Sequence, residues 1–154
     1  MVAKKKTKSA FDSKFTSARG LTQRIVGVRE ERGAKEQLPL LSISFKDFDN
    51  SQCPPGQTYE EWCNSGRLVD LMKKFEEICQ HNRIEAMQMK MLKIYDDFPS
   101  NSHFKIPPHI EGNVQWGTIQ RIGGQKPRLA GYIIDSVFYA VFLDENHLFY
   151  PSKK

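Results

Sequence analysis

Apolar and polar positions alternate most clearly near residue 40, and this alternation predicts a strand. Leu41, Ile43 and Phe45 alternate with two serines and a lysine. A half-buried strand shows this two-residue period because successive side chains point to opposite faces of the sheet. Residues 24–28, RIVGV, form a shorter apolar stretch between charges. We interpret this stretch as an edge strand or as part of an extended arm.

The period changes to three and four residues in segment 65–82, which predicts an amphipathic helix. Its apolar positions form one stripe, whereas lysines and glutamates fall mainly on the other faces. Ahead of this segment, Thr58 and Glu61 have the spacing of a capping box, which marks a helix start. We expect the stripe to pack on a sheet. It consists of Leu68, Leu71, Met72, Phe75, Ile78 and Cys79.

Residues 83–95 are ambiguous. Their apolar positions fit a helix, yet segment 90–95 also alternates like a strand. The following segment, 96–109, holds three prolines and several small polar residues. This composition predicts a long loop, and loops of this kind beside a sheet often carry functional residues.

The C-terminal part of the chain predicts a series of strands. Segments 113–122, 128–135 and 136–144 have the apolar content of strands and are separated by turn residues, and residues 147–151 suit a short last strand. Residues 137–143 are almost continuously apolar, so we expect a central strand buried on both faces. The whole pattern predicts an α+β fold. We expect an antiparallel sheet of about four to five strands with one to three helices packed on one face.

Charge divides the chain into two parts. The net charge is +5, and residues 1–35 hold ten Lys or Arg against three acids, whereas the remainder holds thirteen against fifteen. We interpret residues 1–35 as a basic, partly disordered extension and residues 36–154 as a single domain. A basic extension attracts nucleic acid, an acidic partner or an anionic surface. The alternative is a solvated tail that contributes only solubility.

The sequence has no apolar run near the roughly 20 residues of a membrane-spanning helix. The charged N-terminus also lacks the apolar segment of a signal peptide, so we expect a cytoplasmic protein without membrane association. The cysteines, Cys53, Cys63 and Cys79, are three in number, which favours reduced thiols. With His81 they are candidate metal ligands, but their spacing matches no common zinc pattern. We therefore expect no metal and no cofactor.

A polar cluster follows the apolar strand that ends at Leu143. Asp144 and His147 lie in this cluster, and Arg128 begins the neighbouring predicted strand. Imidazole exchanges protons near neutral pH, a carboxylate can orient it, and a guanidinium can neutralise a phosphate. We predict a catalytic site formed by His147, Arg128, Asp144 and Tyr150. The alternative is a polar turn in which Arg128 pairs with Asp144 and His147 is solvated.

Basic residues near this cluster are candidates for contacts with nucleic acid. The segment RIGGQKPR has the glycines and cations of a phosphate-binding loop, but it lacks the helix that must follow one. We therefore interpret it as a hairpin turn that approaches a phosphate backbone. The candidate nucleic-acid-binding residues are Arg121, Lys126, Lys105, Arg24 and Arg29.

The ending RLAGYIIDSVFYAVFLDENHLFYP resembles that of small, mostly uncharacterised bacterial and mobile-element proteins. The shared features are an arginine-bearing strand, a short turn, an aromatic strand that ends in Leu-Asp, then a histidine and an aromatic-proline pair. More loosely, the expected helix and the basic, aromatic last strands are similar to RelE/HigB-like ribonuclease toxins, which cleave RNA without metal. This resemblance implies that Arg128 clamps a phosphate, His147 acts as acid or base, and Tyr150 assists.

Together these observations predict a nucleic-acid-directed protein of a bacterial defence or toxin–antitoxin type, with RNA favoured over DNA. Its enzymatic form would be a metal-independent endoribonuclease. The alternative is a non-enzymatic nucleic-acid-binding or protein-interaction subunit of a mobile-element or defence complex. The protein partner implied by these interpretations is an antitoxin or a larger defence-complex protein.

Overall fold

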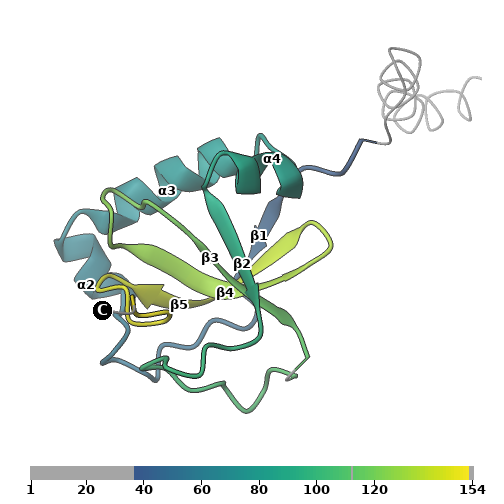
Figure 1. The fold of residues 1–154 in the computed structure, drawn as a ribbon. Coiled ribbons are helices and arrows are strands. Elements are labelled where there is room, and N and C mark those ends of the chain that lie inside the picture. The colour runs from purple at the N-terminus through teal and green to yellow at the C-terminus, as the bar shows by residue number, and fades with distance from the viewer. Residues whose placement is uncertain (1–36, 112, 153–154) are drawn as a thin grey trace, which may run out of the picture. The chain divides into compact units, whose positions relative to one another are not determined.

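The computed structural model describes residues 37–111 and 113–152, which form a mixed sheet with helices on one face (Figure 1). The sheet has five strands in the order β1-β5-β4-β3-β2. An α+β fold is confirmed. The predicted basic extension of residues 1–35 lies outside the described residues. The elements are β1 Ser42–Ser44, α2 Tyr59–Asn64, α3 Arg67–Ile78, α4 Arg83–Gln88, β2 Leu92–Asp96, β3 Gln115–Ile119, β4 Arg128–Ile134 and β5 Val137–Asp144.

The strands from β2 to β5 pair antiparallel, as expected, but β1 runs parallel to β5. Ser42 pairs with Val137, and Ser44 pairs with Tyr139. The alternation that predicted β1 describes how its side chains point, and it contains no information on which strand is the neighbour. The direction of β1 is therefore a property of the assembled sheet.

The strand β5 lies between β1 and β4, so the middle position of the sheet belongs to β4. Beyond its short pairing with β1, the edge of β5 is covered by a loop, because the amides of Asp49 and Gln57 donate to the carbonyls of Val141 and Leu143. A β-bulge explains part of the continuous apolar character of β5, because it lets two successive residues point to the same face. Ala130 pairs with Phe142 and the next residue pairs with Ala140, which leaves Val141 as the extra residue.

The bulge also explains the glycine within β4. A Cβ atom at Gly131 would collide with the carbonyl oxygen of Tyr139 on β5. Only glycine permits this close approach of the two backbones. Val141 and Phe142 both pack in the core on the face opposite the helices, whereas Leu143 returns to the helix face.

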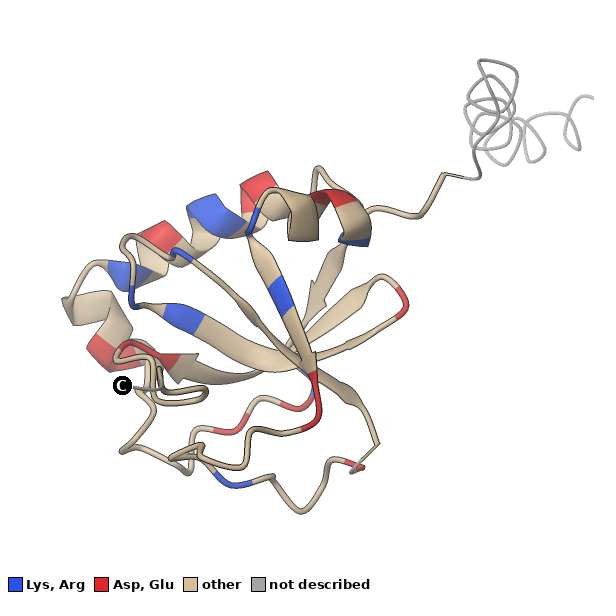
Figure 2. Cartoon of the chain, viewed as in Figure 1, with Lys and Arg blue, Asp and Glu red and all other residues tan. Residues whose placement is uncertain are grey.

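Helix α3 confirms most of the predicted apolar stripe. Leu71 and Ile78 are buried, and Phe75 is partly buried against the core. Met72 is instead 63% exposed, so its place in the stripe was a wrong prediction. Charged residues recur along the same helix (Figure 2). The pattern included Met72 because methionine is hydrophobic. Met72 lies at the margin of the stripe, however, where its side chain faces solvent.

The predicted helix start at Thr58 is confirmed, and the cap of α4 at Asn82 was not predicted. Thr58 is the N-cap of α2, and its hydroxyl accepts from the amide of Glu61 at 3.2 Å. Asn82 and Glu85 form a full capping box at the start of α4. The ambiguous segment 83–95 resolves into both predicted elements, because α4 is followed directly by β2.

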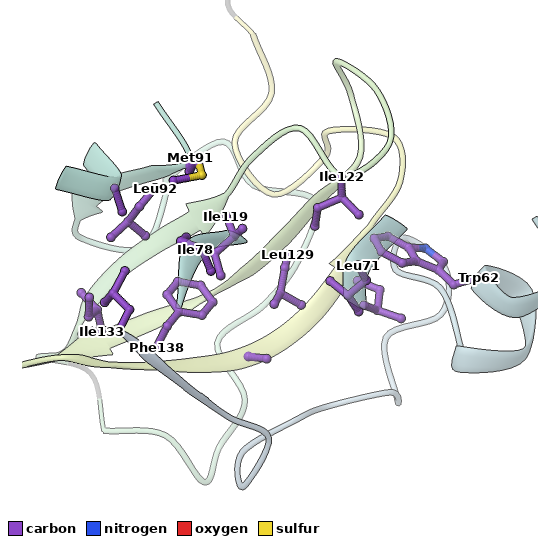
Figure 3. Packing of buried hydrophobic residues seen from close by; sticks show 14 residues of the cluster. Trp62, Leu71, Ile78, Met91, Leu92, Ile119, Ile122, Leu129, Ile133 and Phe138 are labelled. Atoms are coloured by element: carbon purple, nitrogen blue, oxygen red, sulfur yellow. The ribbon is translucent and has the colours of Figure 1, made fainter. Parts of the chain in front are cut away.

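The core of the helix face is made by side chains from all three described helices and from the sheet (Figure 3). A row of aliphatic residues crosses four strands in register, because Leu92 pairs with Ile119, Ile119 with Leu129, and Leu129 with Leu143. All four side chains are buried. This row provides a rigid base for the residues that follow it at the end of the sheet.

The opposite face of the sheet is covered by coil segments. Phe104 of the predicted long loop stacks on Phe142 with ring centroids 4.4 Å apart, and Phe98 meets Trp116 edge to face at 4.9 Å. Phe149 of the C-terminal segment is fully buried among them. We call this side the loop face. The proline-rich loop therefore packs as the second layer of the core.

Replacing Ile78 by Ala should lower the free energy of unfolding by about 2–5 kcal/mol, because its side chain is 0% exposed in the helix-face core. Met72→Ala is the matched control on the same helix and should cost less than about 0.5 kcal/mol. Urea denaturation followed by circular dichroism measures both values. Equal costs for the two variants would contradict the burial pattern of α3.

Candidate nucleic-acid interface

Basic residues from four segments meet at one end of the sheet. Because the strands are antiparallel, β2 begins, β3 ends, β4 begins and β5 ends on the same side of the aliphatic row. Blue segments on β2 and at the start of β4 mark this region in Figure 2. We call it the cationic end. Its basic residues are Lys90, Lys93, Arg121, Lys126, Arg128 and His147.

The acidic residues near the cationic end are fewer than the basic ones, and one of them, Asp70, lies against Gly123 in the β3–β4 turn. Glu145 is already paired with Arg67 at 3.2 Å, and the carboxylate of Asp144 is bound by backbone amides. Between residues 37 and 152, as far as they are described, no ion pair involves the lysines or arginines of the cationic end. Like charges held together in this way repel one another and attract an anion.

Arg128 is the most unusual of these cations. Its guanidinium is half-buried, and its Nε is buried without a hydrogen-bond partner in the described part of the chain. Burial lowers the pKa of Arg128 and so does nearby Arg121, although Tyr95 and Asp144 partly oppose the change. An unsatisfied charged donor costs free energy in the unbound protein. Arg128 therefore retains hydrogen-bonding capacity for an anion.

Asp144 lies directly opposite Arg128 in the strand register, yet no ion pair joins them. The Asp144 carboxylate accepts from the amide of Leu148 at 2.9 Å and from the amide of Phe149 at 2.8 Å. Burial raises the pKa of Asp144, although these amides and Arg128 oppose the rise. The salt bridge expected for a simple polar turn is therefore not formed.

His147 lies in the turn that Asp144 closes. Its backbone φ is 60°, in the left-handed region that few non-glycine residues adopt. Burial lowers the pKa of the half-buried imidazole, and the charges of Arg128, Lys93 and Lys126 lower it further. The side chain is consequently neutral at pH 7 and able to accept a proton.

The predicted orienting role of Asp144 stays a prediction, because the structure links its carboxylate to His147 only through the backbone. No hydrogen bond joins its carboxylate to the imidazole of His147 in the described structure. Because the two amides that it binds belong to the residues after His147, the carboxylate holds the backbone turn that carries the imidazole. Asp144 is thus placed to position His147 through the chain.

Tyr150 forms an aromatic pair beside these cations. Its ring stacks on Tyr95 of β2, with centroids 4.3 Å apart and an interplanar angle of 5°. The ammonium of Lys93 lies 5.3 Å from the centre of the Tyr95 ring. The sequence analysis did not identify Lys93 or Tyr95 as part of this group. The strand-like alternation of Lys93 and Tyr95 was the available signal, because it places both side chains on one face.

The other predicted residues do not join this group. Lys105 is exposed on the loop face, where its backbone amide and carbonyl bond Gln52 at 2.8 Å each. Arg24 and Arg29 lie outside the described residues. The cysteines are free thiols, and no group of three or more potential metal ligands occurs among the residues that the structure describes.

In comparisons with known proteins, no family model, curated protein or solved structure matches the chain. The resemblance of its last strands to ribonuclease toxins therefore stays a prediction. None of the described helices is sufficiently long and apolar to cross a bilayer.

Titration of His147 tests the geometry of the cationic end. Its pKa should lie below 6.5, and Arg128→Gln should raise it because one repelling charge is removed. The native state then binds fewer protons than the unfolded state, so the free energy of unfolding should fall as pH drops below 6.5. Imidazole resonances followed by NMR report the pKa. Arg83→Gln is the control, and an unchanged pKa in Arg128→Gln would place the guanidinium away from His147.

Proposed function

We propose that this protein binds RNA through the cationic end, with a backbone phosphate held by Arg128. The observation that carries the proposal is the half-buried Arg128 guanidinium, whose Nε has no hydrogen-bond partner among the described residues. A phosphate accepts from a guanidinium in a charge-assisted geometry and would give Arg128 the anionic partner that no described residue provides. Binding would also relieve the repulsion among the neighbouring lysines and arginines.

The arrangement of side chains around Arg128 supports a single strand as the ligand. The lysines and arginines come from β2, the β3–β4 turn and the start of β4, which suits a backbone that crosses several strands. Tyr150 stacks on Tyr95, whose ring lies beside Lys93, and aromatic rings next to basic residues are typical of single-strand binding. Unpaired bases are available for such contacts mainly in single-stranded RNA.

Two inferences from the sequence support RNA in particular. The last strands are similar to RelE/HigB-like ribonuclease toxins, and the basic segment 1–35 would add sequence-independent attraction to phosphates. We propose on the same basis that the protein belongs to a bacterial defence or toxin–antitoxin system. An antitoxin, or a subunit of a defence complex, would then be its protein partner.

RNA affinity of the full-length chain tests the role of Arg128. Arg128→Gln should weaken binding of a mixed-sequence single-stranded RNA roughly tenfold to a hundredfold, because a charge-assisted hydrogen bond is lost. The dependence of affinity on salt should also become shallower by about one unit of slope. Fluorescence anisotropy across a salt series measures both effects.

The matched control removes the same charge elsewhere. Arg83 of α4 bonds Gln115 at the opposite end of β3, at 2.6 Å. Arg83→Gln should therefore change RNA affinity much less than Arg128→Gln. Equal affinity and equal salt slope for wild type and Arg128→Gln would reject the phosphate site, and a duplex DNA preference would reject RNA as the ligand.

RNA cleavage is a second candidate function, favoured by the neutral His147 beside Arg128. The imidazole would take the proton of a ribose 2′-hydroxyl, and the 2′-oxygen would attack the adjacent phosphorus. The bond from phosphorus to the 5′-oxygen would break, and that oxygen would receive the proton from the imidazolium through water. The products are a 2′,3′-cyclic phosphate and a 5′-hydroxyl, so no other reactant is required. Arg128 would stabilise the charge that develops on the phosphoryl oxygens.

Single-turnover cleavage in the presence of a metal chelator tests this reaction. His147→Gln should slow cleavage by about 10²- to 10⁴-fold, the usual contribution of a general base, while RNA affinity stays near the wild-type value. Analysis of the products for cyclic phosphate ends identifies the chemistry. If the wild-type chain and His147→Gln degrade RNA at the same rate, His147 is not the catalytic base, and if neither degrades it, the protein is a non-enzymatic RNA-binding module.

A further inference from the structure

An open pocket lies beside the Arg128 site, at the outer side of the cationic end. Its volume is about 290 Å³, close to the lower limit of small-ligand sites, which is roughly 300 Å³. It is formed by the end of α4, the start of β2 and the residues that follow β3. The lining residues are Met87, Lys90, Leu92, Lys93, Gln120 and Arg121.

The pocket combines two kinds of surface. Leu92 and Met87 give it an apolar side, and both side chains are held by secondary structure. Two lysines and an arginine give it a positive side. The amide of Gln120 donates to the carbonyl of Met91 at 2.8 Å and fixes β2 to the residue after β3. This combination suits a ligand that has a flat apolar part and a phosphate.

The backbone is strained on both sides of this pocket. Lys90 has a φ of 59° and Arg121 a φ of 60°, so two lining residues adopt the left-handed conformation. Glycine or asparagine takes this conformation at lower cost than lysine or arginine. At Lys90 this conformation closes the end of α4, because the amide of Lys90 donates to the carbonyl of Met87 and the amide of Met91 to that of Ala86. Both side chains are cations, and both line the same pocket.

The pocket is also close to the proposed phosphate site. Gln120 and Arg128 each lie one residue beyond the paired Ile119 and Leu129, on neighbouring strands. Adjacent strands are about 4.8 Å apart. The charge of Arg121 acts on Arg128, and the charge of Lys93 acts on His147, which places these pocket cations near the site.

We propose that the pocket binds a single nucleotide of the RNA, next to the phosphate held by Arg128. The base lies against the exposed side chain of Met87, and the nucleotide's own phosphate lies among Lys90, Lys93 and Arg121. The Gln120 carboxamide, whose nitrogen donates to the hydroxyl of Thr118 at 3.4 Å, faces the polar edge of the base with its oxygen and its second amide hydrogen. This inference rests on the proposed function, because it makes the pocket part of the same RNA-binding surface.

Mononucleotides provide the first test. Adenosine, guanosine, cytidine and uridine 5′-monophosphates are titrated into the full-length, ¹⁵N-labelled protein, with ribose 5-phosphate as the probe that lacks a base. At least one nucleotide should shift the amides of Leu92, Gln120 and Arg121, and should bind at least about tenfold more tightly than ribose 5-phosphate. Equal binding of all five compounds, or shifts confined to other regions, would overturn the base pocket.

Substitution by asparagine separates the side chains from the backbone conformation. Lys90→Asn with Arg121→Asn removes two charges while keeping residues that tolerate a positive φ. This double variant should weaken nucleotide binding at least about tenfold. The control, Lys73→Gln with Arg83→Gln, removes two charges outside the pocket and should leave binding within about twofold. Equal weakening in both double variants would show that the loss of affinity reflects net charge and not the pocket, and it would reject the proposal.

RNA affinity then separates this inference from the function on which it rests. If Arg128→Gln weakens RNA binding but the asparagine double variant changes neither RNA affinity nor base preference, the base pocket is wrong and the RNA proposal stands. If the wild-type protein binds no RNA, the RNA proposal fails, and the inference fails with it even if a free nucleotide binds. If both variants weaken RNA binding and an abasic residue in the RNA has the same effect as the asparagine variant, both proposals hold.

Discussion

The carboxylate of Asp144 connects the core of this protein to its candidate site. It is fully buried at the end of β5 and accepts from the amides of Leu148 and Phe149. These two bonds draw the C-terminal segment onto the sheet and place Phe149 in the centre of the loop-face core. A buried carboxylate requires such partners, because its charge is costly away from water. The same two bonds turn the carboxylate toward the backbone of the C-terminal segment, so Asp144 acts on Arg128 through its charge without forming a salt bridge.

This arrangement lowers the free energy of unfolding, and the packing of the core must offset the loss. Arg128 is partly desolvated without an acidic partner, and several lysines and arginines share its surroundings. His147 and Arg121 add left-handed backbone at the same end of the sheet. The two-layer packing makes this possible: helices cover one face, and aromatic coil segments cover the other. Functional sites in proteins often concentrate such unfavourable features where a rigid scaffold supports them.

Much of the fold could be predicted because its signals are local. The alternation in β1, the apolar stripe of α3 and the capping residues each depend on the side chains of one short segment. Local information also placed Arg128 near the end of β5, since a tight turn at Asp135 sets the register of two antiparallel strands, but the bulge at Val141 is what brings Arg128 opposite Asp144 and not Leu143.

The remaining features depend on contacts between segments far apart in the sequence. The parallel direction of β1, the bulge at Val141 and the stacking of Tyr95 on Tyr150 are examples. A periodic pattern states which face of an element is apolar, but it does not identify the surface that covers this face. For that reason Lys93 escaped notice as part of the site, although it lies between two apolar residues of a correctly suspected strand.

The position of β2 at the edge of the sheet has a further consequence. An edge strand exposes unpaired backbone groups and can recruit a second chain into a continuous sheet, which leads to aggregation. Here the strand is only five residues long, carries the charge of Lys93, and is interrupted by a bulge between Ile94 and Asp96. Lysines and bulges are the devices by which natural proteins block such edge-to-edge growth. The residues that we assign to ligand binding at β2 would thus also keep the protein monodisperse, so solubility and recognition constrain the same short strand.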